Sequence, residues 1–411
     1  MILEGQSNLI MKVENGSVTS PKGYRATGIY ANLRKKDKLD LGIIVSEVPA
    51  SCAAVYTLNA FQAAPLKITK ESIAKEGKIQ AIVCNSGNAN ACTGEQGEKD
   101  ASAMRHEVAV KFSLEDHYVA VASTGVIGEL LPMDKISAGI EQLQPVDTLE
   151  GGELFSRAIL TTDLVPKTTC YQIEVDGKKV TIAGAAKGSG MIHPNMATML
   201  GFVTSDVNIE SNVLQNALSE ITNKTFNRIT VDGDTSTNDM VVVMANGMAE
   251  NESLTSFHPD WDVFYKTLQK VCEDLAKEIA RDGEGATKLV EVQVEGALSD
   301  EDAGKIAKSV VGSSLVKTAV HGADANWGRI ICAVGYCGVE VDPNLVDVFI
   351  GEIQMLKAGQ PIPFSEEEAT SYLKGTEVVI KVNLHIGEGK GKAWGCDLSY
   401  DYVRINASYR S

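Results

Sequence analysis

The stretch KGSGMIHPNMATML spans residues 187–200 and places Thr198 directly after a small residue, Ala197. If the bond between these two residues were cut, Thr198 would carry a free amine beside its own hydroxyl. A free α-amine has a pKa of about 8, so at neutral pH it can accept the hydroxyl proton. The stretch therefore indicates a self-processing chain whose nucleophile is an N-terminal threonine.

A second interpretation of this stretch stays open. The apolar run MATMLGFV, residues 196–203, is also typical of a buried strand in which the threonine only packs. For self-cleavage, strained backbone near Gly188 and Gly190 would have to push the Ala197 carbonyl onto the Thr198 hydroxyl. The local pattern does not separate the two interpretations, so other motifs have to.

Composition narrows the class of protein. The 411 residues are 44% hydrophobic with 11 prolines, which predicts a globular chain of two or three domains. The net charge of -16 argues against nucleic-acid partners and anionic membrane surfaces. No apolar run reaches the roughly 18 residues of a membrane span, and the first 20 residues lack a signal peptide's apolar core. We therefore expect a cytoplasmic protein.

Cysteine and histidine patterns predict no metal site. The eight cysteines have no CxxC pair and mostly apolar neighbours, which favours reduced thiols in the core. His193 and His321 lie in glycine-rich segments without a ligand-spaced partner. The segment HGADANWGRI, residues 321–330, admits a catalytic dyad, but its polar groups favour a structural loop.

Hydrophobic spacing predicts mixed α/β structure. Short apolar runs ending in glycine and small polar residues indicate N-terminal strands, two stretches have helical spacing, and alternating runs indicate further strands towards a strand-like C-terminus. A separate C-terminal α/β unit is expected from about residue 290. The predicted strands are 81–85, 118–128, 289–296 and 377–387, and the predicted helices are 212–224 and 261–281.

Two further segments suggest chemistry. In STGVIG, residues 123–128, the Thr124 hydroxyl and the Gly125 amide can point two donors at a developing oxyanion. In TVDGDTSTND, residues 230–239, a strand followed by Asp-x-Asp-x-Thr resembles the motif of a magnesium-dependent phosphatase. Asp232 would then be its nucleophile, Asp234 its acid, and RDGEGAT, residues 281–287, would hold the metal.

Seven segments taken together, in order and spacing, resemble the ArgJ family, the glutamate N-acetyltransferases or ornithine acetyltransferases of arginine biosynthesis. The resemblance extends over nearly the whole chain, so it is far more specific than any single motif. The segments are KGSGMIHPNMATML, STGVIGELLP, TTDLVPK, DGDTSTND, RDGEGATK, GADANWGRI and YVRINASYRS.

The resemblance implies a layered α/β sandwich related to N-terminal-nucleophile folds, with a smaller C-terminal α/β domain. It implies self-cleavage into an α chain, 1–197, and a β chain beginning at Thr198. The β chain would consist of a first part, 198–289, and the C-terminal domain, 290–411. Two α and two β chains would form a heterotetramer.

The implied reaction is ping-pong acetyl transfer. Thr198 attacks the acetyl group of N2-acetylornithine while Thr124 and Gly125 hold the oxyanion, and glutamate then takes the acetyl group from the threonine ester. No cofactor is implied, although acetyl-CoA is a possible second donor. By the same resemblance the substrate-binding residues are Thr162, Lys187, Thr198, Glu284, Asn406 and Ser411, with Thr161 an alternative to Thr162.

Other functions remain alternatives at this point. An amidase or aminopeptidase of related fold would let water open the acyl-enzyme, and an unprocessed metabolite-binding protein would leave Thr198 as a strand residue. The phosphatase centred on Asp232 is the alternative from a different enzyme class.

Overall fold

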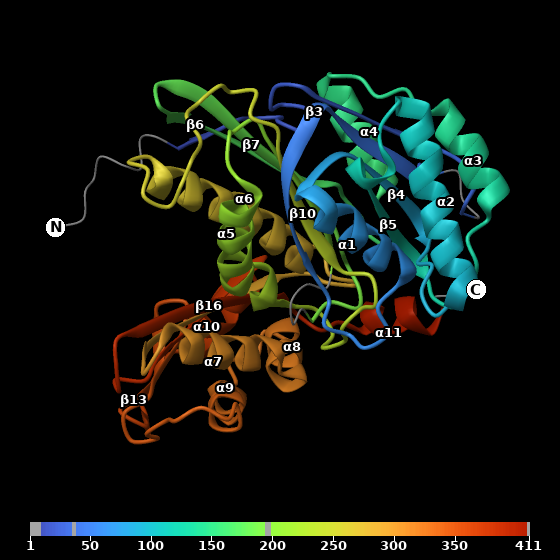
Figure 1. Cartoon of the computed structure of the whole chain (residues 1–411). Helices are drawn as coiled ribbons and strands as arrows, with labels where there is room; N and C mark the ends of the chain where they lie inside the picture. The colour runs from blue at the N-terminus through green and yellow to red at the C-terminus, as the bar shows by residue number, and fades with distance from the viewer. Residues whose placement is uncertain (1–9, 35–37, 194–198, 409–411) are drawn as a thin grey trace. The chain divides into compact units, whose positions relative to one another are not determined.

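The computed structural model describes residues 10–34, 38–193 and 199–408, which form two compact units (Figure 1). The second unit consists of the C-terminal part of the chain and two short segments from its middle. The two units are therefore not separated by a single boundary in the sequence. Unit 1 contains Met1–Gly188, Asn195–Thr222 and Thr235–Leu275, and unit 2 contains Ser189–Pro194, Asn223–Asp234 and Ala276–Ser411.

Unit 1 is built on a nine-stranded mixed sheet. Its strand order is β1-β6-β7-β8-β10-β3-β4-β5, with β2 paired to β3. The strands are β1 (Met11–Lys12), β2 (Tyr24–Ile29), β3 (Leu41–Tyr56), β4 (Lys78–Asn88), β5 (Val119–Val126), β6 (Lys167–Val175), β7 (Lys178–Lys187), β8 (Leu200–Ser205) and β10 (Met240–Ala245).

The long strand β3 divides this sheet into two halves. Its first part pairs with β2 and β4, its last part pairs with β10, and the register with β4 shifts between Val45 and Ala50. Side chains of both halves share one inner core, in which Ile82 and Ala122 belong to the same cluster as Phe202. The sheet thus contributes two layers around a common interior.

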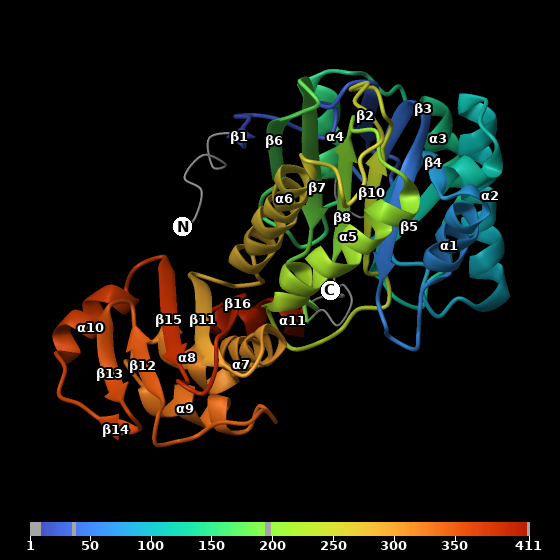
Figure 2. The same ribbon diagram turned by 60° about the vertical axis from the view of Figure 1, so that its left-hand side comes forward.

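Helices cover the outer faces of the two halves. Because strand side chains alternate between faces, Val83 and Val121 point away from the inner core and pack with Met104 of α2 (Gly94–Phe112). On the other half, a side chain at Gly184 of β7 would lie 2.7 Å from Leu275 of α6 (Trp261–Arg281). Figure 2 shows α6 and α5 (Ser211–Lys224) beside β7, β8 and β10. Unit 1 is therefore a layered α/β sandwich, as predicted.

The helices of unit 1 include both predicted ones, α5 and α6, whose bounds agree with the sequence prediction to within one residue. Their apolar faces are buried, as the helical spacing requires. The helices are α1 (Ala64–Glu76), α2 (Gly94–Phe112), α3 (Met133–Gln142), α4 (Leu149–Ala158), α5 (Ser211–Lys224) and α6 (Trp261–Arg281), the last two ending in residues of unit 2. Short 3-10 turns occupy Asp116–Tyr118 and Phe226–Arg228.

Unit 2 has a seven-stranded sheet in the order β14-β13-β12-β15-β11-β16-β9 with its own apolar core. The predicted strand at 289–296 is confirmed as β11, and the one predicted at 377–387 forms as β15 but ends at Asn383; the two strands pair in parallel. The elements are β9 (Ile229–Thr230), β11 (Leu289–Ala297), β12 (Asp347–Ile350), β13 (Ile353–Lys357), β14 (Gln360–Pro361), β15 (Glu377–Asn383), β16 (Gly389–Cys396), α7 (Asp300–Gly312), α8 (Ser314–His321), α9 (Trp327–Gly335), α10 (Glu366–Leu373) and α11 (Tyr400–Ala407).

Two predictions were wrong in detail. The C-terminal segment forms a helix, α11, because Ser399 caps it by accepting a hydrogen bond from the Asp401 amide at 3.2 Å, and its exposed side chains offer no face to a sheet. Cys92 and Cys332 are exposed rather than in the core, although all eight cysteines are free thiols.

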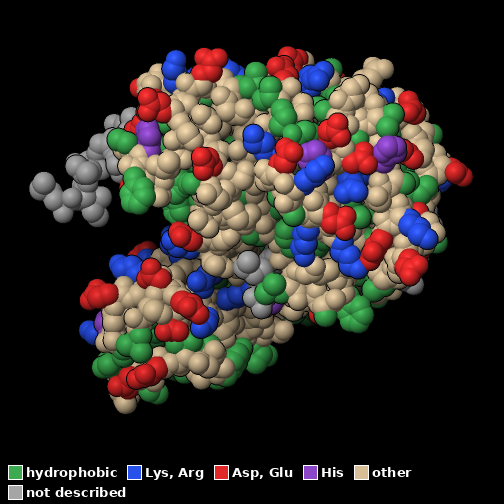
Figure 3. All heavy atoms as spheres, viewed as in Figure 1, with side chains coloured by type: hydrophobic (Ala, Val, Ile, Leu, Met, Phe, Trp, Pro, Cys, Tyr) green, Lys and Arg blue, Asp and Glu red, His purple; other side chains and the backbone are tan. Residues whose placement is uncertain are grey.

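None of the helices in the described ranges combines the length and apolar composition that crossing a membrane requires. Over the face of unit 1 seen in Figure 3, acidic and basic side chains are interspersed.

Candidate active site

The predicted oxyanion donors lie at the end of β5. Thr124 continues the inner-face series of Ala120 and Ala122, and its side chain is buried. Gly125 has φ +137°, and a side chain there would lie 2.5 Å from the Asn88 amide nitrogen. Glycine is required at this position because the backbone of β4 approaches so closely.

Lys187 reaches Thr124 across the inner core. Lys187 is the last residue of β7, its side chain is buried, and its Nζ donates to Thr124 Oγ1 at 3.3 Å. Since the hydroxyl oxygen accepts from the lysine, the hydroxyl hydrogen is left to point at another acceptor. The pair thus forms a donor arrangement in the interior of unit 1.

A buried ion pair lies beside Lys187. Asp163 Oδ1 accepts from Lys167 Nζ and from the Gly188 amide, both at 2.7 Å, and both ionic side chains are inaccessible to solvent. Burial opposes ionisation of Asp163, but Lys187 and Lys167 together hold the pKa of this carboxyl well below its usual range. Asp163 therefore fixes the chain at the end of β7 as an anion. Sequence reasoning missed it, although it lies inside the quoted TTDLVPK segment.

The structure distinguishes Thr161 from Thr162. The Thr161 amide donates to Asp163 Oδ2 at 2.9 Å, and its hydroxyl lies 3.5 Å from the same oxygen. The half-buried Thr162 has no hydrogen-bond partner for its hydroxyl among the described residues. The Thr161 hydroxyl thus faces Asp163, and Thr162 as the substrate contact stays a prediction.

The segment before the predicted cleavage point is held tightly within unit 2. Asp232 accepts the amides of Met191 and Ile192 at 2.6 and 2.9 Å, and His193 Nδ1 lies 2.9 Å from Thr230 Oγ1. Burial lowers the pKa of His193 to about 4, so the imidazole is neutral at physiological pH. Met191 has φ +55°, which is strained for a residue with a side chain.

Glu284 and Asn406 form the second cluster of predicted residues, also in unit 2. Asn406 Nδ2 donates to Glu284 Oε2 at 2.8 Å, and the Glu284 amide donates to Ser189 O at 2.9 Å. A side chain at Gly190 would lie 2.5 Å from Glu284 Oε1, so glycine there allows the carboxylate to approach the backbone.

Asp232 is not placed as a phosphatase nucleophile. Its two oxygens accept the backbone amides named above, and Oδ1 also lies 3.2 Å from the Asp234 amide. A carboxylate that holds a loop in this way is occupied with structural hydrogen bonds.

The predicted residue His321 belongs to a hydrogen-bond network in unit 2. His321 Nδ1 lies 2.7 Å from Asp397, which also accepts from the Thr287 hydroxyl and from the amides of Thr287 and Lys288. His321 thus joins a network that fastens the loop after β16.

Ala197, Thr198 and Ser411 lie outside the described residues.

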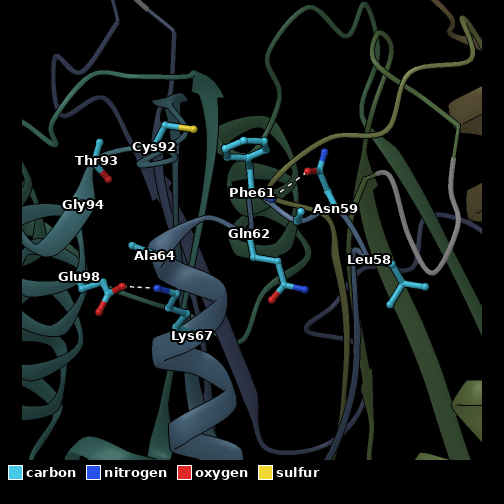
Figure 4. A pocket seen from close by; sticks show the side chains of 11 residues that line it. Leu58, Asn59, Phe61, Gln62, Ala64, Lys67, Cys92, Thr93, Gly94 and Glu98 are labelled. Atoms are coloured by element: carbon cyan, nitrogen blue, oxygen red, sulfur yellow. Dashed lines mark hydrogen bonds and ion pairs between the residues drawn. The ribbon is translucent and has the colours of Figure 1, made fainter.

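A separate surface pocket of about 470 Å³ lies between the loop before α1 and the start of α2 (Figure 4). Exposed Phe61 and Leu58 line one side, and the Lys67–Glu98 ion pair lies at the other. None of the predicted site residues lines this pocket.

The model of the ArgJ family matches residues 25–411. This chain belongs to the ArgJ family. The arginine biosynthesis bifunctional protein ArgJ of Halalkalibacterium halodurans is 67% identical over 98% of both chains, and that of Geobacillus stearothermophilus is 62% identical over 100% of both. A crystal structure of argJ from Bacillus halodurans matches with 63% identity and TM-score 0.45, covering 46% of this chain and 98% of the solved chain.

Membership confirms the predicted family and enzyme class. As an ArgJ protein the chain is an acetyltransferase of arginine biosynthesis that acts on small-molecule substrates. The phosphatase alternative is therefore not supported by the family, in agreement with the occupied carboxylate of Asp232.

Proposed function

We propose that the chain transfers the acetyl group of N2-acetylornithine to glutamate through an acetyl ester on Thr198. The observation that carries this proposal is the buried contact of Lys187 with Thr124. Lys187 is the first residue of the stretch 187–200, which contains Thr198. A hydroxyl whose oxygen is engaged by a lysine presents its hydrogen outward, which suits an oxyanion.

The first half-reaction forms the ester. Thr198 Oγ attacks the acetyl carbonyl and gives its proton to its own amine, while Thr124 and the Gly125 amide stabilise the tetrahedral oxyanion. The C–N bond then breaks, the proton passes to the leaving amine, and ornithine departs. In the second half-reaction the amine of glutamate attacks the ester, and N-acetylglutamate leaves with Thr198 restored. We propose acetyl-CoA as a second donor to the same threonine.

The proposed substrate-binding residues are matched by charge to the groups of the substrate. Lys187 binds a carboxylate, Thr162 donates or accepts a hydrogen bond, and Glu284 held by Asn406 binds an ammonium group. Thr198 and Ser411 complete the proposed set. Both substrates are amino acids, so the same residues serve both half-reactions.

Processing precedes this chemistry. We propose that the chain cuts itself between Ala197 and Thr198, giving α chain 1–197 and β chain 198–411, the latter with parts 198–289 and 290–411. The strained φ of Met191 supports a stressed segment upstream, closer to the cut than the glycines that the sequence suggested. An α2β2 assembly in the cytoplasm belongs to the same proposal.

The test combines mass and activity. Wild-type protein should give two fragments under denaturing conditions, Thr198→Ala one chain of 43.9 kDa, and the control Thr198→Ser two fragments again. Processed enzyme should then convert N2-acetylornithine and glutamate into equal amounts of ornithine and N-acetylglutamate. Ornithine with free acetate would instead indicate the amidase, and an uncut wild-type chain would remove the free amine that the mechanism needs.

A further inference from the structure

Asn238 lies in the segment DGDTSTND, residues 232–239, which has no part in the proposed mechanism. The residue is buried just before β10. Both hydrogens of its side-chain amide are used, because Nδ2 donates to Ala89 O at 2.5 Å and to Ser123 O at 2.8 Å. Its Oδ1 accepts from Thr237 Oγ1 at 2.6 Å. The amide is therefore fully satisfied, with its nitrogen facing two backbone carbonyls.

The two carbonyls lead to the two ends of the dipeptide 124–125, which provides the proposed oxyanion donors. Ser123 directly precedes this dipeptide, and its carbonyl lies in the peptide plane that begins it. Ala89 holds the other end, because its own amide donates to the carbonyl oxygen of Val126 at 2.9 Å. Asn238 thus holds the dipeptide at both ends, directly at Ser123 and through Ala89 at Val126.

The ladder between β4 and β5 does not fix the dipeptide in a regular way. Its register shifts between Gly87 and Asn88, which lie opposite the donors, and Gly125 has φ +137°. At such an irregularity the repeating ladder bonds are interrupted. The hydrogen bonds of Asn238 supply a constraint there from another part of the chain.

The same part of the chain contacts the residue that follows Thr198 in the sequence. Met240, two residues after Asn238, donates its amide to Met199 O at 2.9 Å, and β10 continues in parallel with β8. The short segment 238–240 is therefore bonded both to the strand with the oxyanion donors and to the residue next to the proposed nucleophile.

We propose that Asn238 is a positioning residue, which holds the oxyanion donors at the reacting distance from Thr198. Donors and nucleophile have to meet at one acetyl carbonyl, and a misplacement of about 1 Å costs roughly 10²-fold in rate. Asn238 acts through the backbone of Ser123 and Ala89, so its loss should slow the chemical step. The inference rests on the proposed roles of residues 124, 125 and 198.

The test measures how fast acetyl is loaded onto Thr198. Processed enzyme is mixed with N2-acetylornithine in the absence of glutamate, and the acetylated β chain is quantified by mass at successive times. Only β chains that begin at Thr198, distinguished by mass from uncut precursor, are counted. Asn238→Leu has a side chain of similar size without hydrogens to donate. We expect its loading rate at saturation to fall about 10²-fold, with the final acetylated fraction and the half-saturating substrate concentration unchanged.

Asn246, at the other end of β10, gives the matched control. It is also a buried asparagine, and its Nδ2 donates to Lys22 O at 2.8 Å. Asn246→Leu should lower the temperature of thermal unfolding without changing the loading rate. A purely structural role of Asn238 predicts the same result for Asn238→Leu, with fewer reactive chains but a normal rate in those that react.

Asn238→Asp decides the question if Asn238→Leu does not fold. It keeps the shape of the side chain but has at most one hydrogen for the two carbonyls, so loading should again be slow and complete. A wild-type rate in a folded Asn238 variant, a reduced acetylated fraction at a normal rate, or equal slowing in Asn246→Leu would overturn the inference. Failure of both Asn238 variants to fold would also overturn it, because the residue would then be structural. Absence of loading in wild type rejects the proposed function instead.

Discussion

Lys187 Nζ donates to Thr124 Oγ1 at 3.3 Å and so joins the ends of β7 and β5 across the inner core of unit 1. These strands belong to different halves of the sheet, and only the folding of that sheet around β3 brings them together. The hydroxyl group of Thr124 can rotate about its C–O bond, and the contact with Lys187 fixes its orientation.

Removal of the Thr124 hydroxyl should therefore reduce the rate of acetyl transfer. We expect Thr124→Val to lower kcat roughly 10²- to 10³-fold, the usual effect of losing one oxyanion donor. Thr124→Ser, which keeps the hydroxyl, should retain most activity. Steady-state kinetics with N2-acetylornithine and glutamate measure both, and equal kcat for Thr124→Val and wild type would exclude this role.

Thr162 and Thr161 should respond differently to the same change. Thr162→Val should lower kcat/KM about tenfold through loss of one ligand hydrogen bond. Thr161→Val should change kcat/KM little, because its hydroxyl faces Asp163. The reverse order of effects would assign the substrate contact to Thr161.

Asp163→Asn should destabilise unit 1 by roughly 3–5 kcal/mol, because it leaves Lys167 charged and buried without its partner. The exposed pair of Asp262 and Lys266, 2.9 Å apart, gives the matched control. Asp262→Asn should cost less than about 1 kcal/mol. Urea unfolding at pH 7 measures both variants, and similar losses would show that burial does not matter here.

The pH dependence of the same ion pair has a defined sign. The pKa of Asp163 is depressed in the folded state, so its stabilisation is present above the unfolded value of about 3.9 and is lost as pH falls towards the folded one. Wild type should lose stability below about pH 4 more steeply than Asp163→Asn. Parallel curves of unfolding free energy against pH would contradict the assignment.

Gly125→Ala should impair folding or activity more than a nearby glycine substitution. The added methyl group would lie 2.5 Å from the Asn88 amide nitrogen, whereas at Gly128 nothing lies within 4 Å. Both glycines have positive φ, so Gly128→Ala carries the backbone strain, about 1–2 kcal/mol, without the clash. Thermal unfolding and acetyl transfer of the two variants separate the contributions of strain and collision.

Glu284→Gln should weaken binding of the substrate that carries a terminal ammonium. Loss of a charge-assisted hydrogen bond predicts a rise in KM for N2-acetylornithine of roughly 10- to 100-fold. Glu388→Gln, a change at an exposed glutamate, should leave KM unchanged. A normal KM for Glu284→Gln would remove this residue from the proposed site.

Much of the local structure could be predicted from spacing alone. The helices 212–224 and 261–281 and the strands 289–296 and 377–387 form where periodicity placed them, because burial of one face dominates their stability. The C-terminus was misassigned because its pattern is short and exposed, so the cap at Ser399 decides the conformation.

The site was predicted only in part. Motifs led to Thr124, Lys187 and Glu284 as predicted site residues, but they did not point to Asp163. The role of Asp163 comes from its burial and from the charged groups around it, Lys187 and Lys167. A sequence does not show which acidic side chains are removed from water.

The sequence by itself determined the family and the identities of the groups available for chemistry, because motif order and residue type are properties of the chain. Only the tertiary structure decided which of these groups meet. It joined Lys187 to Thr124, occupied Asp232 with backbone amides and buried Asp163 with Lys167. The reason is physical: hydrogen bonds and pKa values depend on distance and solvation, and both are fixed only when distant strands pack around a common core.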